Sequence, residues 1–415
     1  MLNTPFSPWP SFTEEEANAA RDVILSNKVN YWTGQECRLF EKEFAAWTGA
    51  EYAIALANGT VALDVALQAL GIGAGDEVVV TPRTFLASVS CIVNVGAVPV
   101  FADVDRDSQN ITAETIRSVL TPRTRAVICV HLAGWPCDMD PIMRLADEYG
   151  LKVIEDCAQA HGARYKGRSV GSIGHVGAWS FCQDKIMSTG GEGGMVTTND
   201  PDLWSRMWSF KDHGKSWQAV YEREHPPGFR WLHESFGTNW RMIEVQAAIG
   251  RIQLRRMAEW QAKRLANARA IWAAASAFDC LRVPAIPEVV VHAAYKCYVF
   301  VEPTRLCDGW SRDRILHEIT ALGVPCYSGS CSEVYLEKAF DNTSWRPAER
   351  LPVARELGET SLMFLVHPTL GADEIIATCE AMESVLRMAC IDADRGRGNS
   401  IFAEVPSVAC TADGA

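Results

Sequence analysis

Residues 152–157 read KVIEDC, an apolar run that leads into Glu155 and Asp156. A run with almost no polar break predicts a strand buried on both faces, as strands covered by helices are. Asp156 then stands at the carboxyl end of the strand, the edge where open α/β sheets bind ligands. A carboxylate buried there is costly unless it pairs with a cation or accepts several hydrogen bonds. For an Asp taken alone, a helix cap or a structural ion pair is the more common explanation.

Six further apolar runs flank this one, and segments with helical periodicity separate many of them. Strands that alternate with amphipathic helices predict an α/β fold, with a mostly parallel sheet covered by helices. The expected helices include residues 59–70, 85–95, 113–120 and 140–149. The other six expected strands are residues 52–57, 77–81, 98–104, 125–131, 177–182 and 193–199.

The pattern changes after about residue 240. Met242, Val245, Ile249 and Ile252 recur at steps of three and four, which predicts one face of a long helix. Five parts are therefore expected: an N-terminal arm (1–30), a large domain (31–240), a long connecting helix (241–278), a smaller C-terminal α/β domain (279–391) and a tail (392–415) expected to be mobile.

Charge and hydropathy argue against several classes of function. The 51 acidic and 39 basic residues give a formal charge of −12, which argues against a broad nucleic-acid-binding surface. Residues 1–16 lack the features of a signal peptide, and polar side chains interrupt the most apolar stretch, residues 78–104. We therefore expect a cytoplasmic protein that binds neither nucleic acid nor membrane.

The cysteines and histidines form no metal motif in the sequence. Fourteen cysteines are scattered without a C-x-x-C pair, and nine histidines lack metal-ligand spacing. Cys326 and Cys331 are the closest pair, and a disulfide or metal clip there is a minor alternative for an intracellular chain. Reduced cysteines and no bound metal are expected.

A lysine lies in an unusual setting at SFCQDKIMSTGGEGG, residues 180–194. Lysines in polar stretches are almost always solvated surface groups. Lys185, however, follows the end of an expected strand and precedes a glycine-rich loop that allows close backbone approach. A lysine desolvated in such a place can act as an amine nucleophile.

A third group of polar residues, Asn58, Gly59 and Thr60, lies between an expected strand and an expected helix. Free N–H groups at a helix start suit a phosphate, Gly59 permits close approach and Thr60 adds a hydroxyl. On these three residues alone, a plain helix cap is the better explanation.

Read together, these segments resemble the DegT/DnrJ/EryC1/StrS family of sugar aminotransferases, which are fold type I enzymes that use pyridoxal 5'-phosphate (PLP). The resemblance runs over residues 32–386, and the order and spacing of its motifs make it specific. The motifs are ANGT at 57–60, GDEV at 75–78, TFLAS at 84–88, DVD at 103–105, HLAG at 131–134, EDCAQAHGA at 155–163, Lys185 with GEGG at 191–194, and NWRM at 239–242.

The resemblance implies a role for four residues around the cofactor ring. Lys185 would carry PLP as a Schiff base and act as the general acid and base. Asp156 would pair with the pyridinium nitrogen, which keeps the ring an electron sink. Phe85 would stack on the ring, and Gln159 would lie near its other side or its O3′ edge.

The resemblance also implies a phosphate site and a homodimer. Gly59, Thr60 and Ser180 would hold the phosphate. The neighbouring subunit would supply Asn239 to that phosphate, so each active site would be shared across the dimer interface.

The implied reaction moves an amino group from L-glutamate, through the cofactor, to a nucleotide-linked keto-(deoxy)sugar. Its place would be amino-sugar biosynthesis for a surface polysaccharide or a glycosylated metabolite. Arg241 is a candidate for an anionic contact with the donor carboxylate or the sugar-nucleotide diphosphate. Tyr327 is a candidate substrate contact in GVPCYSGSC, residues 323–331, where this chain departs from the family pattern.

Three alternatives stay open at this point. Some family members are PLP-dependent sugar dehydratases, but these replace the lysine with histidine, and Lys185 is present here. A non-catalytic regulatory homologue would be expected to lose site residues. An aminotransferase for amino acids only would usually present an arginine for the second carboxylate, and none can be assigned.

Overall fold

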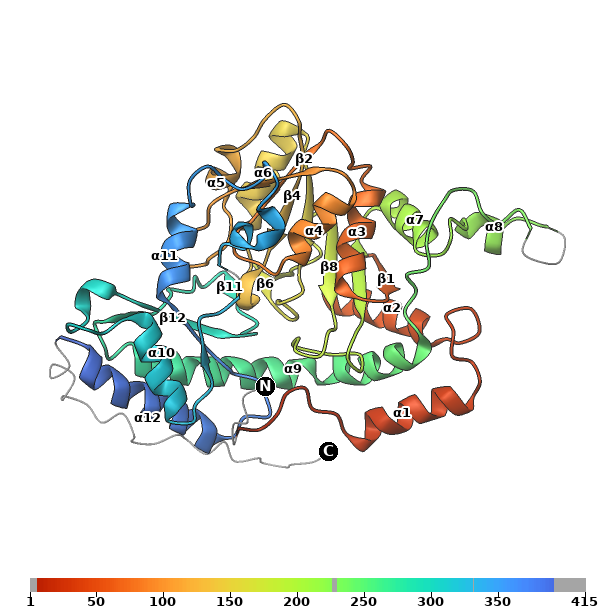
Figure 1. Ribbon diagram of the computed structural model, residues 1–415. Coiled ribbons are helices and arrows are strands. Elements are labelled where there is room, and N and C mark those ends of the chain that lie inside the picture. Colours follow the sequence, from red (N-terminus) through yellow and green to blue (C-terminus); the bar gives the residue numbers. More distant parts are fainter. Residues whose placement is uncertain (1–5, 226–229, 331, 392–415) are drawn as a thin grey trace.

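A seven-stranded sheet forms the centre of the larger domain (Figure 1). The computed structural model describes residues 6–225, 230–330 and 332–391. β9 runs antiparallel to both of its neighbours, and the other adjacent pairs are parallel, which confirms the predicted α/β fold. In sheet order the strands are β1 (Tyr52–Leu56), β9 (Gly194–Thr198), β8 (Val176–Ser180), β5 (Lys152–Asp156), β4 (Thr124–Val130), β2 (Glu77–Val80) and β3 (Val98–Phe101).

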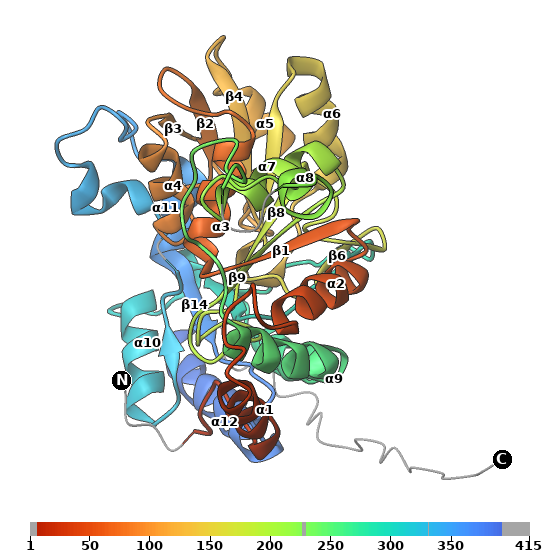
Figure 2. The same cartoon turned by 90° about the vertical axis from the view of Figure 1, so that its right-hand side faces the viewer.

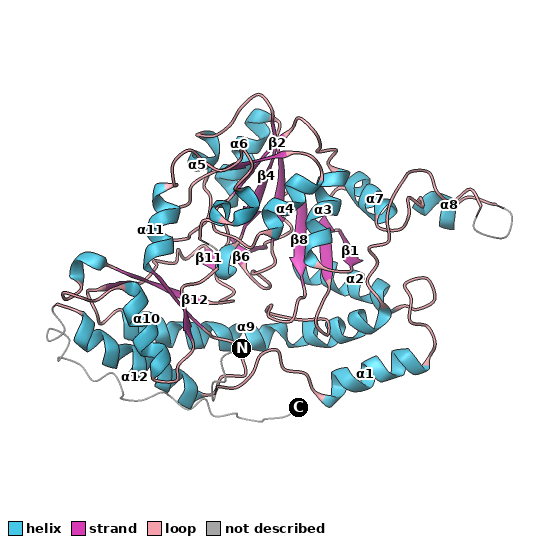
Figure 3. Cartoon of the chain, viewed as in Figure 1, coloured by secondary structure: helices cyan, strands magenta, loops and turns pink. Residues whose placement is uncertain are grey.

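Helices cover both faces of this sheet (Figure 3). In β1, Ile54 and Leu56 face one buried cluster while Ala53 and Ala55 face another, so both faces of the strand are apolar. That double burial explains why the strands read as continuous apolar runs. One face packs against α3 (Gly59–Ala69), α4 (Ala87–Asn94) and α7 (Pro201–Phe210), and the other against α2 (Glu36–Thr48), α5 (Ala113–Arg117) and α6 (Met139–Tyr149).

A 32-residue helix, α9 (Glu244–Ala275), connects the two domains inside the predicted range 241–278. α2 and α1 (Glu14–Leu25) pack against it, above and below in Figure 2. Arg256 of α9 bonds the carboxylates of Glu15 and Glu16 in α1. The N-terminal arm is thus attached to α9 by ion pairs as well as by packing.

The smaller C-terminal domain has its own sheet and core, and lies beside α9 in Figure 1. Its strands, in sheet order, are β10 (Leu281–Arg282), β12 (Cys297–Val301), β14 (Ser361–Phe364) and β13 (Cys326–Tyr327), all antiparallel to their neighbours. Its helices are α10 (Arg312–Ala321), α11 (Pro352–Thr360) and α12 (Ala372–Ala389).

The remaining elements are short. β11 (Val290–Val291), β6 (Arg164–Tyr165) and β7 (Arg168–Ser169) form a three-stranded sheet, and α8 (Trp217–Tyr221) lies on a segment that projects from the large domain. The 3₁₀ turns are η1 (Leu132–Gly134), η2 (Pro303–Arg305), η3 (Val334–Leu336) and η4 (Lys338–Phe340). Among the residues that the structure describes, no helix is long and apolar enough to cross a membrane.

One cysteine pair differs from the expectation of reduced cysteines. Cys280, before β10, and Cys390, after α12, form a disulfide, because the packing of α12 brings two residues that are distant in sequence together. Cys326 is a free thiol in β13, and burial raises its pKa to about 12. Cys331 and the tail at 392–415 lie outside the described residues.

Candidate active site

A cavity of about 770 Å³ opens at the carboxyl ends of β5 and β8. Most of the residues that the sequence singled out line it: Gly59, Thr60, Phe85, Asp156, Gln159, Ser180 and Lys185. Strand geometry explains part of this convergence. Asp156 is paired with Ala178, and Ser180 lies two residues beyond Ala178, so these side chains emerge on one face of the sheet.

Asp156 is buried on the sheet face covered by α3 and α4. The Ser88 hydroxyl of α4 donates to its Oδ2 at 2.7 Å, and the Ala158 N–H donates to its Oδ1 at 3.1 Å. In the described part of the chain, no lysine, arginine or histidine forms an ion pair with this carboxylate. A buried carboxylate with neutral partners at the wall of a cavity is suited to a cationic ligand group.

The neighbouring carboxylate, Glu155, points to the opposite face of β5 and has a different environment. It accepts hydrogen bonds from the N–H groups of Gly171, Ile173 and Gly174, and His131 Nε2 lies 3.0 Å from its Oε2. His131 Nδ1 in turn accepts from the Cys137 N–H. His131, Glu155 and Cys157 lie close enough to hold a metal ion, but these hydrogen bonds engage the His131 and Glu155 acceptors, so we assign Glu155 a structural role.

Lys185 lies in the turn after β8, and its side chain is only 15% exposed. The Trp9 indole donates to the Lys185 carbonyl at 2.7 Å, which ties the turn to the N-terminal arm. The Lys185 Nζ lies 5.5 Å from the ring centroid of Tyr295 and 4.0 Å from Asp184 Oδ1. Tyr295 donates its hydroxyl proton to Asp184 Oδ2 at 2.6 Å, so these two side chains hold each other beside the amine.

Burial and nearby charges determine the pKa values of the two neighbours of Lys185, Asp184 and Tyr295. Burial acts to raise the pKa of Asp184, but nearby Lys185, the Tyr295 hydroxyl and Lys296 outweigh it and lower that pKa. Burial, and then the Asp184 charge, raise the pKa of Tyr295 well above its usual value. Asp184 is therefore an anion and Tyr295 a neutral donor at neutral pH.

The start of α3 forms one end of the cavity. Asn58 caps the helix by accepting from the Val61 N–H at 3.0 Å, and Gly59 packs against Ser180. The first N–H groups of a helix have no intrahelical partner and attract anions. With the hydroxyls of Thr60 and Ser180 at the same end, the arrangement suits a phosphate group.

The close packing of Gly59 leads to a testable prediction. A Cβ added there would lie 2.5 Å from the Ser180 Cβ, which is too close for a real contact. Gly59→Ala must therefore displace the phosphate cradle, the group formed by Gly59, Thr60 and Ser180 at the start of α3. We expect at least about tenfold weaker cofactor affinity, since roughly 1.4 kcal/mol of lost contact is enough for that change. Equilibrium dialysis against PLP measures it.

Gly73→Ala is the matched control for that variant. A Cβ at Gly73 meets nothing closer than the Val95 carbonyl oxygen at 3.7 Å, an ordinary contact. Equal PLP affinity of the Gly59→Ala variant and the wild type would contradict the assignment of this end of the cavity to the phosphate.

Phe85 and Gln159 form further parts of the cavity wall. Phe85 stands just before α4 and is 66% exposed, which is costly for an aromatic residue unless a ligand covers it. Gln159 is buried, and its Oε1 accepts from the Ala133 N–H at 2.9 Å, which leaves the amide NH₂ to donate to a ligand.

These residues fit PLP as a set. A phosphate cradle at α3, a buried carboxylate without a cationic partner, an uncovered aromatic ring and a desolvated lysine line one cavity. Each supplies what one part of PLP requires: the phosphate, the pyridinium nitrogen, the ring face and the aldehyde carbon.

Three residues expected in the site lie outside the cavity of this single chain. Asn239 is exposed beside Asp212, and Arg241 is held in an ion pair, with its Nη1 2.6 Å from Asp212 Oδ1. Tyr327 lies in β13 and packs with the cluster between the domains. Their roles in binding stay predictions.

Several site residues were not foreseen from the sequence. Ser88 belongs to the TFLAS motif at 84–88, and its hydroxyl one helical turn after Thr84 is a signal that the sequence carries. Asp184 adjoins Lys185, and a carboxylate next to a candidate amine is also a signal in the sequence. Tyr295 and Trp9 come from distant parts of the chain, and no local pattern marks them.

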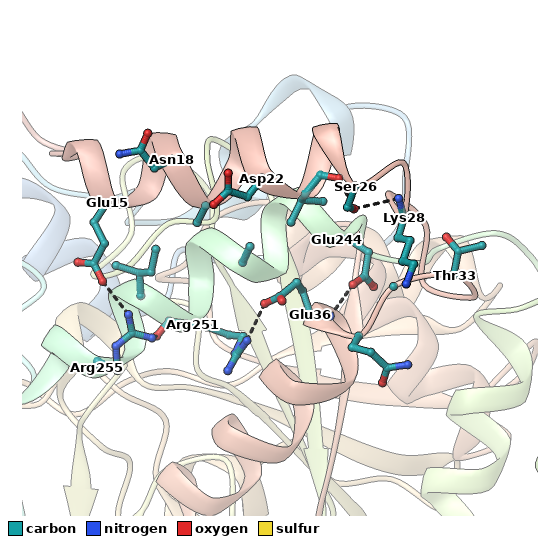
Figure 4. Close-up of a pocket in the computed structure, with 16 residues that line it drawn as sticks. Glu15, Asn18, Asp22, Ser26, Lys28, Thr33, Glu36, Glu244, Arg251 and Arg255 are labelled. Carbon is teal, nitrogen blue, oxygen red and sulfur yellow. Dashed lines mark hydrogen bonds and ion pairs between the residues drawn. The ribbon is translucent and has the colours of Figure 1, made fainter.

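A second cavity of about 750 Å³ lies between α1 and α9 (Figure 4). Its charged side chains are largely paired with each other: Arg251 with Glu36 and Arg255 with Glu15. We therefore regard this cavity as part of the attachment of the arm and not as a reactive site.

Comparison with known proteins identifies relatives over nearly the whole chain. The model of the DegT/DnrJ/EryC1/StrS aminotransferase family matches residues 10–383. GDP-perosamine synthase from Caulobacter vibrioides is 38% identical over 376 residues, which cover 88% of this chain and 95% of that protein. A dTDP-3-amino-3,4,6-trideoxy-alpha-D-glucose transaminase from Streptomyces venezuelae is 32% identical and covers 89% of this chain and 92% of its own length.

A solved structure gives the same result for the fold. The X-ray structure of an aminotransferase from Psychrobacter cryohalolentis superposes with a TM-score of 0.91 at 67% sequence identity. The match covers 92% of this chain and 98% of that one.

Proposed function

Since this chain belongs to the DegT/DnrJ/EryC1/StrS aminotransferase family, whose members are fold type I enzymes that use PLP, we propose that it transfers an amino group from L-glutamate to a nucleotide-linked keto-sugar. The observation that carries the proposal is that Lys185, Asp156, Phe85 and the start of α3 all line the same cavity. Amino-sugar biosynthesis for a surface polysaccharide or a glycosylated metabolite is the corresponding pathway class.

When bound, PLP supplies a ring that withdraws electrons from the carbon whose bond to hydrogen is broken. Lys185 holds the cofactor and moves a proton at that carbon, since its Nζ is the amine that lines the cavity. Asp156 holds the ring nitrogen in its protonated form. Tyr295 and Asp184 position the lysine amine, and Ser88 orients the Asp156 carboxylate.

The names of the relatives support a nucleotide-linked acceptor. One is a GDP-perosamine synthase and another a transaminase named for a dTDP-linked amino sugar. The two names differ in nucleotide and in sugar, so the proposal is limited to the class of acceptor.

The alternatives are less well supported. A dehydratase of this family would lack the lysine, and Lys185 lies desolvated in the cavity. A non-catalytic homologue would not be expected to retain the ring carboxylate, the phosphate cradle and the lysine together in one cavity.

The proposed reaction can be tested directly by measuring the glutamate half-reaction before the sugar acceptor is added. Holoenzyme mixed with L-glutamate alone should release 2-oxoglutarate up to one equivalent per active site and then stop, because the amino group stays on the cofactor. Addition of a keto-sugar nucleotide should restart the release. Absence of 2-oxoglutarate with loaded enzyme would overturn the glutamate-dependent reaction.

We also propose that the enzyme is a homodimer with shared active sites. The segment that carries α8 projects from the large domain (Figure 1), and Asn239, which follows it in the chain, is exposed beside Asp212. Trp231 and Phe236 on this segment are 77% and 98% exposed, which is costly for aromatic side chains without a partner. A second copy of the chain that covers them would bring Asn239 to the phosphate of the neighbouring site.

Mixed dimers test this arrangement. Lys185→Ala and Asn239→Ala chains, each impaired alone, are unfolded, mixed in equal amounts and refolded together. If Asn239 acts across the interface, one of the two sites in each heterodimer is intact, and about one quarter of wild-type activity returns. No recovery in the mixture, with dimers present by light scattering, would show that both residues act within one chain.

We place the reaction in the cytoplasm. Ten of the described cysteines are free, and eight of these are buried. Free thiols persist in reducing compartments. Cell fractionation with detection of the native protein measures the location.

A further inference from the structure

Positive charge gathers behind the catalytic lysine in a way that the proposed chemistry does not use. Lys296 follows Tyr295, and its Nζ lies 4.9 Å from the centroid of the Tyr295 ring that Lys185 also approaches. Arg264 of α9 and Lys185 are close enough to Lys296 to lower its pKa, and Asp184 opposes them. Lys185 and Lys296 therefore share one carboxylate, Asp184, which Tyr295 already engages, while Arg264 has no share in it.

Arg264 is the most unusual member of this group. Its side chain is 1% exposed, and its Nε and Nη2 are buried without a hydrogen-bond partner. It lies over the Trp9 ring, with its Cζ 4.8 Å from the ring centroid, and forms no ion pair with a carboxylate of the described residues. Burial lowers its pKa to about 9. A buried guanidinium without a carboxylate is expensive, so an anionic ligand near it would be bound strongly.

Lys296 lies beside the site, because its Nζ and the Nζ of Lys185 both approach the ring of Tyr295, which lines the cavity. Lys296 is half-buried just before β12, and burial is the largest cause that lowers its pKa, to about 8. The charged and titratable groups that face it are Lys185 and Asp184 from the turn after β8, Arg264 from α9, and His367 after β14. At neutral pH the ammonium group is therefore still charged but poorly solvated, a state that favours ion pairing with a ligand.

We propose that Lys296, supported by Arg264, binds the side-chain carboxylate of the amino donor. The inference rests on the proposed aminotransferase function. The donor reacts at Lys185, and its second carboxylate is only a few bonds from the reacting carbon, so it must find a cation near Lys185. The cofactor phosphate is assigned to the start of α3, at the end of the cavity formed by Gly59 and Ser180. This arrangement would give a preference for L-glutamate over L-glutamine, because an amide cannot form an ion pair with the Lys296 ammonium group.

Two unreactive donor analogues separate the carboxylates. Glutarate carries both carboxylates of the donor, and glutaramate carries one carboxylate and one amide. Their binding to the holoenzyme is measured by isothermal titration calorimetry for the wild type, Lys296→Gln, Lys296→Arg and, as a surface control, Lys338→Gln. Lys338 is exposed in η4.

We expect Lys296→Gln to weaken the binding of glutarate roughly tenfold to a hundredfold, which corresponds to the loss of one charged hydrogen bond. The affinity for glutaramate should stay unchanged. Lys296→Arg keeps the charge and should stay within a few-fold of the wild type, as should Lys338→Gln. The ratio of kcat/KM for L-glutamate over L-glutamine should fall by the same factor in Lys296→Gln. If Lys296→Gln loses equal affinity for both analogues, or loses affinity for neither, the assignment of the side-chain carboxylate to Lys296 is overturned.

The pH dependence gives a second readout. A lysine loses its charge as the pH rises through its pKa, so glutarate affinity in the wild type should fall above about pH 8. In Lys296→Arg, the guanidinium stays charged and the fall should disappear. The same fall in both proteins overturns the proposal, and this comparison holds even if Lys296→Gln does not fold.

Two different results distinguish an error in the proposed function from an error in the role of Lys296. If wild-type holoenzyme releases no 2-oxoglutarate from L-glutamate, the proposed function is wrong. If it does release 2-oxoglutarate but glutarate binding is insensitive to residue 296, only the assignment of the donor carboxylate is wrong.

Discussion

Replacement of Lys185 by alanine is expected to abolish amino transfer, with kcat reduced by roughly 10⁴-fold, because one side chain both holds the cofactor and moves the proton. Lys185 lies desolvated beside Tyr295 and Asp184 at the wall of the cavity, where the described residues place no second amine in the lining. The loss should appear in both half-reactions, since the same amine serves each direction.

The measurement combines kinetics with a chemical label. Borohydride reduction of the wild-type holoenzyme, followed by peptide mass spectrometry, should find the cofactor on Lys185. Lys185→Arg keeps the positive charge but should be as inactive as Lys185→Ala, and Lys338→Ala should behave as the wild type. Retention of the label in Lys185→Ala, on another lysine, would show that the cofactor lysine is misassigned.

The second large effect is expected for Asp156→Asn. The amide keeps the shape of the side chain and its hydrogen bond to Ser88, but removes the negative charge that faces the ring nitrogen. We expect kcat to fall by about 100-fold, the upper end of a lost charge-assisted hydrogen bond, with little change in folding stability. Stopped-flow measurement of the glutamate half-reaction, together with a urea unfolding curve, checks both parts.

Glu155→Gln is the matched control one residue earlier in β5. Burial acts to raise the pKa of Glu155, but His131 and the N–H groups of Gly174 and Gly171 outweigh it and lower the pKa. The variant turns an amide NH₂ toward groups that donate, and should cost about 3 kcal/mol of stability while the half-reaction of the folded protein continues. A loss of stability in Asp156→Asn, with kcat preserved, would reverse the two assignments.

The depressed pKa of Glu155 also fixes the sign of a pH effect. A carboxyl whose pKa is lower in the folded state stabilises the fold above its unfolded pKa, and this contribution is lost as the pH falls toward the folded pKa. The stability difference between the wild type and Glu155→Gln should therefore shrink in acid.

Much of the fold follows from local patterns. The seven predicted strands are present in one sheet, because strands buried on both faces read as apolar runs that alternate with amphipathic helices. The long helix was also recoverable, since its periodicity spans many turns, and α9 lies inside the predicted range. Phe85 was expected inside a helix, but α4 begins at Ala87, and that leaves the ring free at the cavity wall.

Local sequence patterns were enough to predict the sheet, the family and the residues at the ends of β5 and β8, because strand direction carries Asp156 and Ser180 to the same edge. The approach of Lys185 and Lys296 to the Tyr295 ring, and the ion pair of Arg241 with Asp212, could be seen only in the folded chain. The physical reason is that periodicity encodes which face of an element is buried, whereas the docking of the small domain and α9 against the sheet sets the distances between side chains far apart in the chain.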